Sequence, residues 1–202
     1  MPPTPATISA APRIVVFAGP NGAGKSTHAD AILAGLGIEV FVNADFIARG
    51  LSGRSSDAVA FEAGRIMLRR LRQLAQDRQE FAFESTLSSR SFAPFLQRQI
   101  DAGYRVSVYY FSLASAALAL QRVRLRVQQG GHDVAADFVR RRFGRSLGNF
   151  MTLYAPMATQ WAIFDNSSLP RARLVALQQG NGPEIKDPVT WRKLQKLALK
   201  SR

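Results

Sequence analysis

The residues best suited to chemistry in this 202-residue sequence lie in one glycine-rich stretch, Gly19 to Thr27. The stretch fits the phosphate-binding loop, a glycine and four residues followed by Gly-Lys-Ser/Thr. Glycines let successive backbone N–H groups surround phosphate oxygens without obstruction by side chains. In this pattern Lys25 reaches the β- and γ-phosphates and Ser26 holds Mg²⁺. We therefore expect a nucleoside triphosphate to be bound by Gly19, Pro20, Asn21, Gly22, Ala23, Gly24, Lys25, Ser26 and Thr27.

The segments on either side of this loop have the expected character. Residues 14–18 are apolar and partly β-branched, which is typical of a short buried parallel strand. Residues 27–33 can continue as a helix, and the positive end of that helix would add to the attraction for phosphate. The context therefore favours a phosphate site over a plain glycine-rich turn.

Polar residues follow three other predicted strands. Asp45 comes after residues 38–42, Glu84 ends residues 80–84, and Asp165-Asn166 follows residues 161–164. In open α/β sheets ligands bind beyond the carboxyl ends of the strands, so these side chains are expected at the same edge.

Phosphoryl transfer needs positioned phosphates, a metal, a proton acceptor and cations. Asp45 is our candidate for the proton acceptor, because a carboxylate can orient a substrate hydroxyl and take its proton. The alternative, which is compatible with that role, is that Asp45 caps the following short helix. Glu84 could hold Mg²⁺ through water, bind a substrate hydroxyl, or be an ordinary carboxylate at the end of a strand. Thr86 could point into the same cleft.

Residues 117–160 carry seven arginines and only two aspartates. In P-loop kinases the helices after the fourth strand often form a lid whose arginines close over the phosphates. We expect Arg126, with Arg140 or Arg141, to stabilise the transferred phosphoryl group, an effect on the order of 10³-fold in rate. The alternative is a solvated basic pair of helices.

Strands that alternate with helices predict an α/β fold with a parallel sheet and right-handed crossovers. The expected architecture is a P-loop kinase-like parallel sheet of five to six strands, flanked by helices and carrying the arginine-rich lid. Further strands are expected at 105–111 and, at an edge, 173–177. Helices are expected at 57–76, 91–102 with Ser91 as its cap, 114–129, and from Asp187-Pro188 onward. Residues 1–13 read as a flexible tail and residues 14–202 as one domain.

Composition limits the class of protein and its partners. The absence of cysteine excludes disulfides and thiolate metal sites. No apolar run approaches the length of a membrane span, and a cytoplasmic location is expected. The net charge of +13 favours anionic partners such as nucleotides, nucleic acid or an acidic protein. An arginine excess of this kind could equally reflect the coding bias of a GC-rich genome.

An ordered series of motifs resembles the zeta toxin-like P-loop kinases. The series spans residues 14 to 168 and comprises Gly19 to Thr27, Asn43-Ala44-Asp45, Glu84-Ser85-Thr86-Leu87-Ser88, Gly130-Gly131-His132 with Arg140-Arg141-Arg142, and Asp165-Asn166-Ser167. The resemblance implies a bacterial kinase that uses ATP and Mg²⁺, with UDP-N-acetylglucosamine as the substrate in zeta toxins proper. It also implies that Asp45 is the base, that Lys25 and the lid arginines stabilise charge, and that Glu84 with Thr86 lines the sugar pocket.

The sequence departs from that family in places. The loop reads Gly-Pro-Asn-Gly-Ala-Gly-Lys-Ser, where the toxins usually have Gly-Gln-Pro-Gly-Ala-Gly-Lys-Thr, and Glu-Ser-Thr stands where the fuller match is Glu-Thr-Thr. The chain is compact and resembles the shorter branch of the family.

Three functions therefore stay open. The first is a small-molecule kinase of the zeta toxin type, neutralised by an acidic antitoxin protein. The second is a polynucleotide kinase or nucleic-acid binder, which the charge favours. The third is an ATP-binding regulatory protein without transfer activity. No membrane partner is expected.

Overall fold

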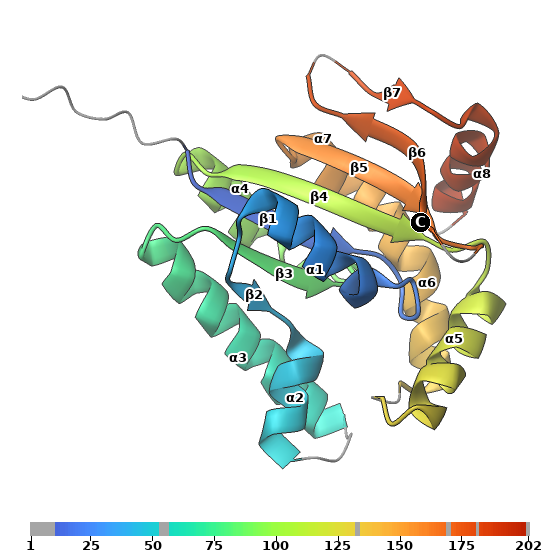
Figure 1. Cartoon of the computed structure of the whole chain (residues 1–202), viewed down its shortest axis with the longest axis horizontal. Helices are drawn as coiled ribbons and strands as arrows, with labels where there is room; N and C mark the ends of the chain where they lie inside the picture. The colour runs from blue at the N-terminus through green and yellow to red at the C-terminus, as the bar shows by residue number, and fades with distance from the viewer. Residues whose placement is uncertain (1–10, 53–56, 132–133, 169–170, 181, 201–202) are drawn as a thin grey trace, which may run out of the picture.

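A seven-stranded sheet runs through the centre of the computed structural model, which describes residues 11–52, 57–131, 134–168, 171–180 and 182–200. The strand order within these residues is β2-β3-β1-β4-β5-β6-β7 (Figure 1). The strands are β1 (Arg13–Ala18), β2 (Phe41–Val42), β3 (Phe81–Ser85), β4 (Arg105–Ser112), β5 (Gln160–Asp165), β6 (Arg173–Gln178) and β7 (Glu184–Ile185). Strands β1 to β5 each pair in parallel with their neighbours among these five, so their carboxyl ends share one edge of the sheet.

Helices cover both faces of the sheet. They are α1 (Lys25–Leu36), α2 (Ala44–Ser52), α3 (Asp57–Gln76), α4 (Ala93–Asp101), α5 (Ala116–Gln128), α6 (Ala136–Asn149), α7 (Ala155–Met157) and α8 (Pro188–Leu199), with the π-helical turn η1 (Phe150–Tyr154) between α6 and α7. Because successive residues of a strand point to opposite faces of the sheet, the strands contribute side chains to two hydrophobic cores. Val16 and Phe83 pack with α3, α4 and α8, whereas Val15 and Phe17 pack with α1 and α5.

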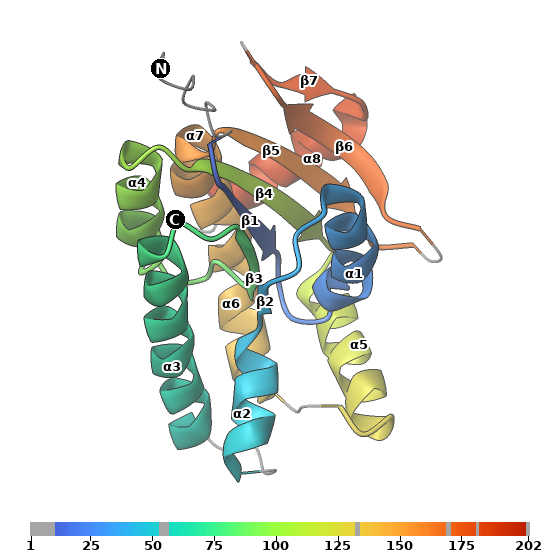
Figure 2. The same ribbon diagram turned by 60° about the vertical axis from the view of Figure 1, so that its left-hand side comes forward.

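Helix α6 contributes to both cores. Val139 and Phe143 belong to the core with α1 and α5, while Leu147 belongs to the core on the other face. Figure 2 shows α2 and α3 on one side and α5 on the other, projecting past the end to which β1 points. The fold thus places α2, α5 and α6 around the loop that follows β1.

The predicted α/β fold with a mainly parallel sheet is confirmed, and the helix predicted at 57–76 is α3. Two strands differ from the prediction. The strand expected at 38–42 is reduced to Phe41–Val42, because only these two residues pair with β3. The strand expected at the edge, β6, pairs antiparallel with β5 on one side and with β7 on the other, so β7 is the edge strand.

The predicted caps of two helices had different outcomes. Ser91 does not cap α4, because the helix begins at Ala93 and the Ser91 amide donates to the Ser89 hydroxyl. Asp187 does cap α8, since its side chain accepts from the amide of Thr190. Residues 1–10 of the expected tail lie outside the described residues, and Arg13 opens β1.

None of the described helices has the length and hydropathy that crossing a membrane requires.

Candidate functional site

The predicted phosphate-binding loop joins β1 to α1. Gly24 precedes α1 with φ 80° and has no side chain to cap the helix, so the amides of the first turn are left for a ligand. At Gly19, with φ 136°, a Cβ atom would lie 2.2 Å from the carbonyl oxygen of Phe111. The close approach of β4 therefore requires glycine at this position.

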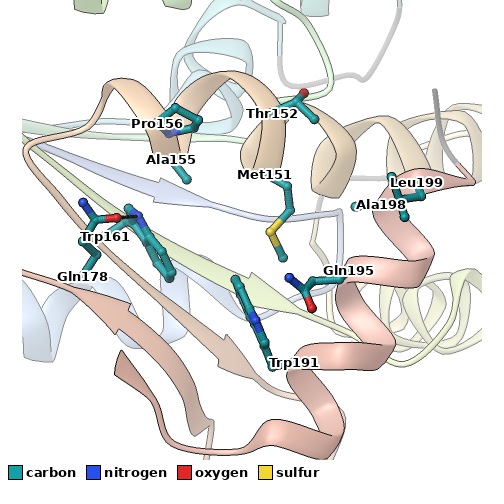
Figure 3. Close-up of a pocket in the computed structure, with 10 residues that line it drawn as sticks. All are labelled: Met151, Thr152, Ala155, Pro156, Trp161, Gln178, Trp191, Gln195, Ala198 and Leu199. Atoms are coloured by element: carbon teal, nitrogen blue, oxygen red, sulfur yellow. Dashed lines mark hydrogen bonds between the residues drawn. The ribbon is translucent and has the colours of Figure 1, made fainter. Parts of the chain in front are cut away.

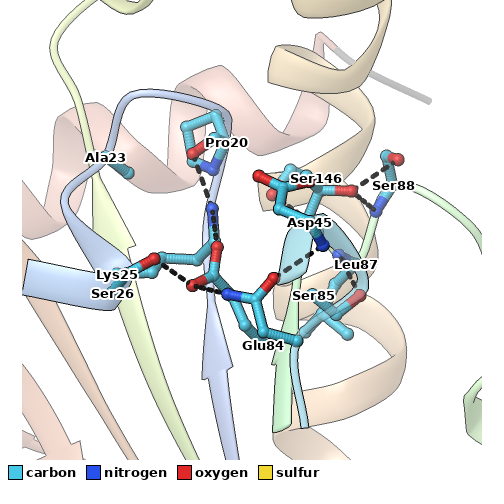
Figure 4. A network of polar contacts seen from close by, with 12 residues as sticks. Pro20, Ala23, Lys25, Ser26, Asp45, Glu84, Ser85, Leu87, Ser88 and Ser146 are labelled. Atoms are coloured by element: carbon cyan, nitrogen blue, oxygen red, sulfur yellow. Dashed lines mark hydrogen bonds and ion pairs between the residues drawn. The ribbon is translucent and has the colours of Figure 1, made fainter. Parts of the chain in front are cut away.

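Glu84 connects the loop to β3 (Figure 4). Its Oε1 lies 3.4 Å from Lys25 Nζ, and its Oε2 accepts a hydrogen bond of 2.5 Å from Ser26 Oγ. Lys25 is 5% exposed and also donates to the carbonyl oxygen of Pro20 at 3.0 Å. A buried ammonium needs such partners, so Glu84 holds the lysine and the hydroxyl of the loop together.

Asn43 links Glu84 to α2. Its Nδ2 donates to Glu84 Oε2 at 3.1 Å, and its Oδ1 accepts from the amide of Asp45 at 2.8 Å. Asn43 therefore caps α2, and the alternative in which Asp45 is the cap is wrong. The Asp45 carboxylate is left to act elsewhere.

Asp45 meets α5 across the carboxyl edge of the sheet. Its Oδ2 lies 3.7 Å from Nη1 of Arg126, the arginine near the end of α5. Their side chains are 37% and 35% exposed, so both groups reach solvent. The structure thus brings together the predicted base and one predicted lid arginine.

Hydrogen bonds connect the segment after β3, which carries Thr86, to α6. Ser146 Oγ donates to the carbonyl oxygen of Thr86 at 2.5 Å and lies 2.9 Å from the hydroxyl of Tyr110. Asn149 Nδ2 donates to the carbonyl oxygen of Leu87 at 2.8 Å. Burial raises the pKa of Tyr110 far above its ordinary value, so this phenol stays protonated. The Thr86 hydroxyl itself lies 2.9 Å from Ser88 Oγ.

Arg140 and Arg141 lie on the exposed side of α6. Arg140 donates to Asp137 on its own helix at 3.0 Å, and the guanidinium of Arg141 lies 4.5 Å from the ring centre of Phe138. Both of these contacts are with residues of α6 itself, and a role over the phosphates stays a prediction for both arginines.

Two further residues support the loop: Asn166, which was expected at this edge of the sheet but without a specific role, and Arg122. Asn166 Nδ2 donates to the carbonyl oxygen of Ala23 at 2.9 Å, and a Cβ at Gly24 would lie 2.5 Å from that nitrogen. Arg122 donates to the backbone carbonyl oxygens of Asn166 at 2.7 Å and Ser167 at 3.1 Å. Arg122 is four residues before Arg126 and hence on the same face of α5, a spacing that could have identified it.

A separate pocket of about 380 Å³ lies between η1, β5 and α8. Figure 3 shows the Trp161 indole N–H donating a hydrogen bond to the side chain of Gln178, with Met151 and Trp191 facing the pocket. The lining contains none of the charged residues described above. This pocket is therefore distinct from the candidate site.

The residues of the loop fit a magnesium nucleotide. Ser26 Oγ and the two oxygens of Glu84 are the hard ligands that Mg²⁺ prefers, directly or through water. Lys25 and the open first turn of α1 suit phosphate oxygens. The site as built therefore accommodates the predicted cofactors.

Known proteins resemble this chain in sequence and in structure. An uncharacterized protein of Haemophilus influenzae is 27% identical over 135 residues, which are 65% of this chain and 92% of that protein. The AvrRxo1-ORF1:-ORF2 complex solved with ATP superposes with a TM-score of 0.73 at 16% identity, covering 92% of this chain and 64% of that one. This chain thus spans just under two thirds of that relative.

A structure from the PezAT toxin-antitoxin system of Streptococcus pneumoniae superposes with a TM-score of 0.60 at 14% identity, covering 96% of this chain and 86% of that one. These structural likenesses establish the fold. The sequence itself matches the zeta toxin family over residues 4–168, most of its length. The resemblance seen in the motifs is thereby confirmed: the chain belongs to the zeta toxin family of P-loop kinases.

Proposed function

We propose that this protein is an ATP- and Mg²⁺-dependent phosphotransferase that moves the γ-phosphoryl group to a hydroxyl of a small nucleotide-sugar-like molecule. Lys25 and the first turn of α1 bind the phosphates of ATP. Ser26 holds Mg²⁺, which supplies charge neutralisation on the phosphate oxygens when bound. Family membership supports the reaction class, and UDP-N-acetylglucosamine is the substrate that the motifs suggest.

The observation that carries this proposal is the pair formed by Asp45 and Arg126 across the sheet edge. A carboxylate at this place can accept a hydroxyl proton, and a guanidinium beside it can balance charge on the transferred group. Asp45 lies in the first turn of α2 and Arg126 in the last turn of α5, a helix that approaches the loop at Gly22 through Ala119 and Arg122. A regulatory nucleotide binder has no need of this pair.

The acceptor is proposed to bind beside Glu84 and Thr86. Asn43 and Lys25 fix the Glu84 carboxylate, and Ser146 fixes the backbone of Thr86. Such fixed polar groups suit a ligand rich in hydroxyls, such as a sugar.

An acidic protein is proposed to neutralise the activity. Two of the similar structures come from the PezAT toxin-antitoxin system and the AvrRxo1-ORF1:-ORF2 complex, and the net charge of +13 suits an acidic partner.

Product identification tests the proposal. Purified protein is incubated with Mg·ATP and a panel of UDP-sugars and free sugars, and products are followed by ³¹P NMR and mass spectrometry. We expect a new phosphate monoester on a UDP-sugar, and its loss in Lys25→Ala. ATP that binds but yields no phosphorylated product across the panel would favour the regulatory alternative instead.

A further inference from the structure

A second pocket, of about 460 Å³, lies between α8 and the carboxyl ends of β4 and β5. Leu113, Leu194 and Leu197 form its apolar part. Its volume is in the range of small-molecule sites, roughly 300–1,000 Å³. Figure 1 shows α8 close to the ends of these strands.

Three lysines line this pocket: Lys193, Lys196 and Lys200. They are three of the five lysines of a chain that otherwise uses arginine. Their spacing places them along one face of α8 and its last turn. The arrangement concentrates ammonium groups at one place on the surface.

Two carboxylates near the pocket share one arginine, and the four cations of its lining outnumber them. Arg173, which also lines the pocket, lies 3.3 Å from Asp165 and 3.1 Å from Asp187. Among the described residues neither Lys193, Lys196 nor Lys200 has an ion pair, so their positive charge is not neutralised within that part of the chain.

The pocket adjoins the phosphate-binding loop without including it. Its lining includes Ser112, Leu113 and Ala114, which follow Phe111, the residue whose carbonyl group lies against Gly19. No residue of Gly19 to Thr27 lines it.

We propose that this pocket binds a small organic phosphate, independently of the function proposed above. The lysine ammonium groups are compact cations that suit phosphate oxygens, and the leucines suit the body of the ligand. The hydroxyls of Ser167 and Ser112 are already engaged, with Asp165 and with the carbonyl oxygen of Phe164. Recognition therefore depends on charge and apolar contact.

An NMR titration of the whole chain with inorganic pyrophosphate, at about physiological salt to screen distant charges, tests this site. We expect saturable shifts of the amides of Leu113, Thr190 and Lys193, in addition to those of the loop. The variant K193Q/K196Q/K200Q should raise the dissociation constant measured from the pocket amides about tenfold or more, since each of the three charges contributes modestly. It should leave the affinity measured from the loop amides unchanged. Lys25→Gln should weaken binding at the loop and leave binding at the pocket unchanged.

A matched control removes the same charge elsewhere. R65Q/R69Q/R72Q loses three cations from the exposed face of α3 and should bind pyrophosphate as the wild type does. Shifts confined to the loop would overturn the proposal, as would equal weakening by the α3 variant. Citrate binding as tightly as pyrophosphate would show a non-selective anion patch and overturn it too.

Discussion

At the scale of single residues, Glu84 and Asn43 organise the site. Glu84 receives Lys25, Ser26 and Asn43 on its two oxygens, and Asn43 in turn caps α2. The same asparagine thus connects the phosphate-binding loop to the helix that carries Asp45. A carboxylate held by three donors keeps its orientation.

Asn43→Ala should destabilise the protein by about 1 kcal/mol or somewhat more, because it removes a helix cap and a partner of Glu84. Urea unfolding measures the change.

Asn43→Asp is the informative companion, since it keeps the cap acceptor but places a second carboxylate beside Glu84. We expect it to remain less stable than the wild type at neutral pH. Full recovery of stability would show that the Asn43–Glu84 hydrogen bond is unimportant.

At the scale of elements, α6 holds the segment after β3 in place. Ser146 is fully buried and contacts both the Thr86 carbonyl oxygen and the Tyr110 hydroxyl. Tyr154, in the π-helical turn after α6, donates to the carbonyl oxygen of Ser89 at 2.7 Å. Because loops lack their own hydrogen-bond ladder, these contacts define the shape of the segment.

Ser146→Ala should cost about 1–3 kcal/mol in unfolding free energy, since the buried Tyr110 hydroxyl and the partly buried Thr86 carbonyl oxygen lose their partner. Ser91→Ala, which removes an exposed hydroxyl from the same segment, serves as the control and should be near neutral. Similar effects of the two substitutions in urea unfolding would contradict the structural role of Ser146.

An ion pair whose effect depends on pH lies at the start of the pairing between β1 and β3. Arg13 donates to both oxygens of Glu80 at 2.6 Å, and this hydrogen bonding lowers the pKa of Glu80 below its ordinary value of 4.5. A lowered folded pKa means that the stabilisation is present above about pH 4.5 and is lost as pH falls through the folded pKa.

Glu80→Gln should therefore cost about 0.5–1 kcal/mol at pH 7, a modest value because both side chains are more than a third exposed. The difference from the wild type should shrink in acid, which unfolding curves between pH 7 and pH 3 can measure. A difference that stays constant over this range would rule out the ion pair as its cause.

At the scale of the whole molecule, the sequence predicted those features that local pattern determines. The phosphate-binding loop, the polar strand ends and α3 follow from motif and periodicity. The hydrogen bond between Asn166 and Ala23 joins residues 143 positions apart, and no local sequence pattern predicts that these two residues meet. β7 was missed because two residues, Glu184 and Ile185, carry no strand pattern.

The net charge of +13 is also a property of the whole molecule. If it acts only through general attraction, single-stranded oligonucleotides should bind weakly at physiological salt, with Kd of about 10⁻⁴–10⁻⁶ M and a steep salt dependence. Fluorescence anisotropy over a salt series measures this. Tight binding that persists in high salt and competes with ATP would instead favour the nucleic-acid function.

The most direct test of the central claim compares Asp45→Asn with Asp101→Asn, which removes an exposed carboxylate at the end of α4. Both variants and the wild type are assayed for phosphoryl transfer to the acceptor found by product identification, and for Mg·ATP affinity. We predict that Asp45→Asn lowers kcat by about 10²–10⁴-fold, the usual contribution of a general base, and leaves ATP affinity within a few-fold. Asp101→Asn should retain wild-type turnover. Undiminished turnover in Asp45→Asn would contradict the assignment of the base.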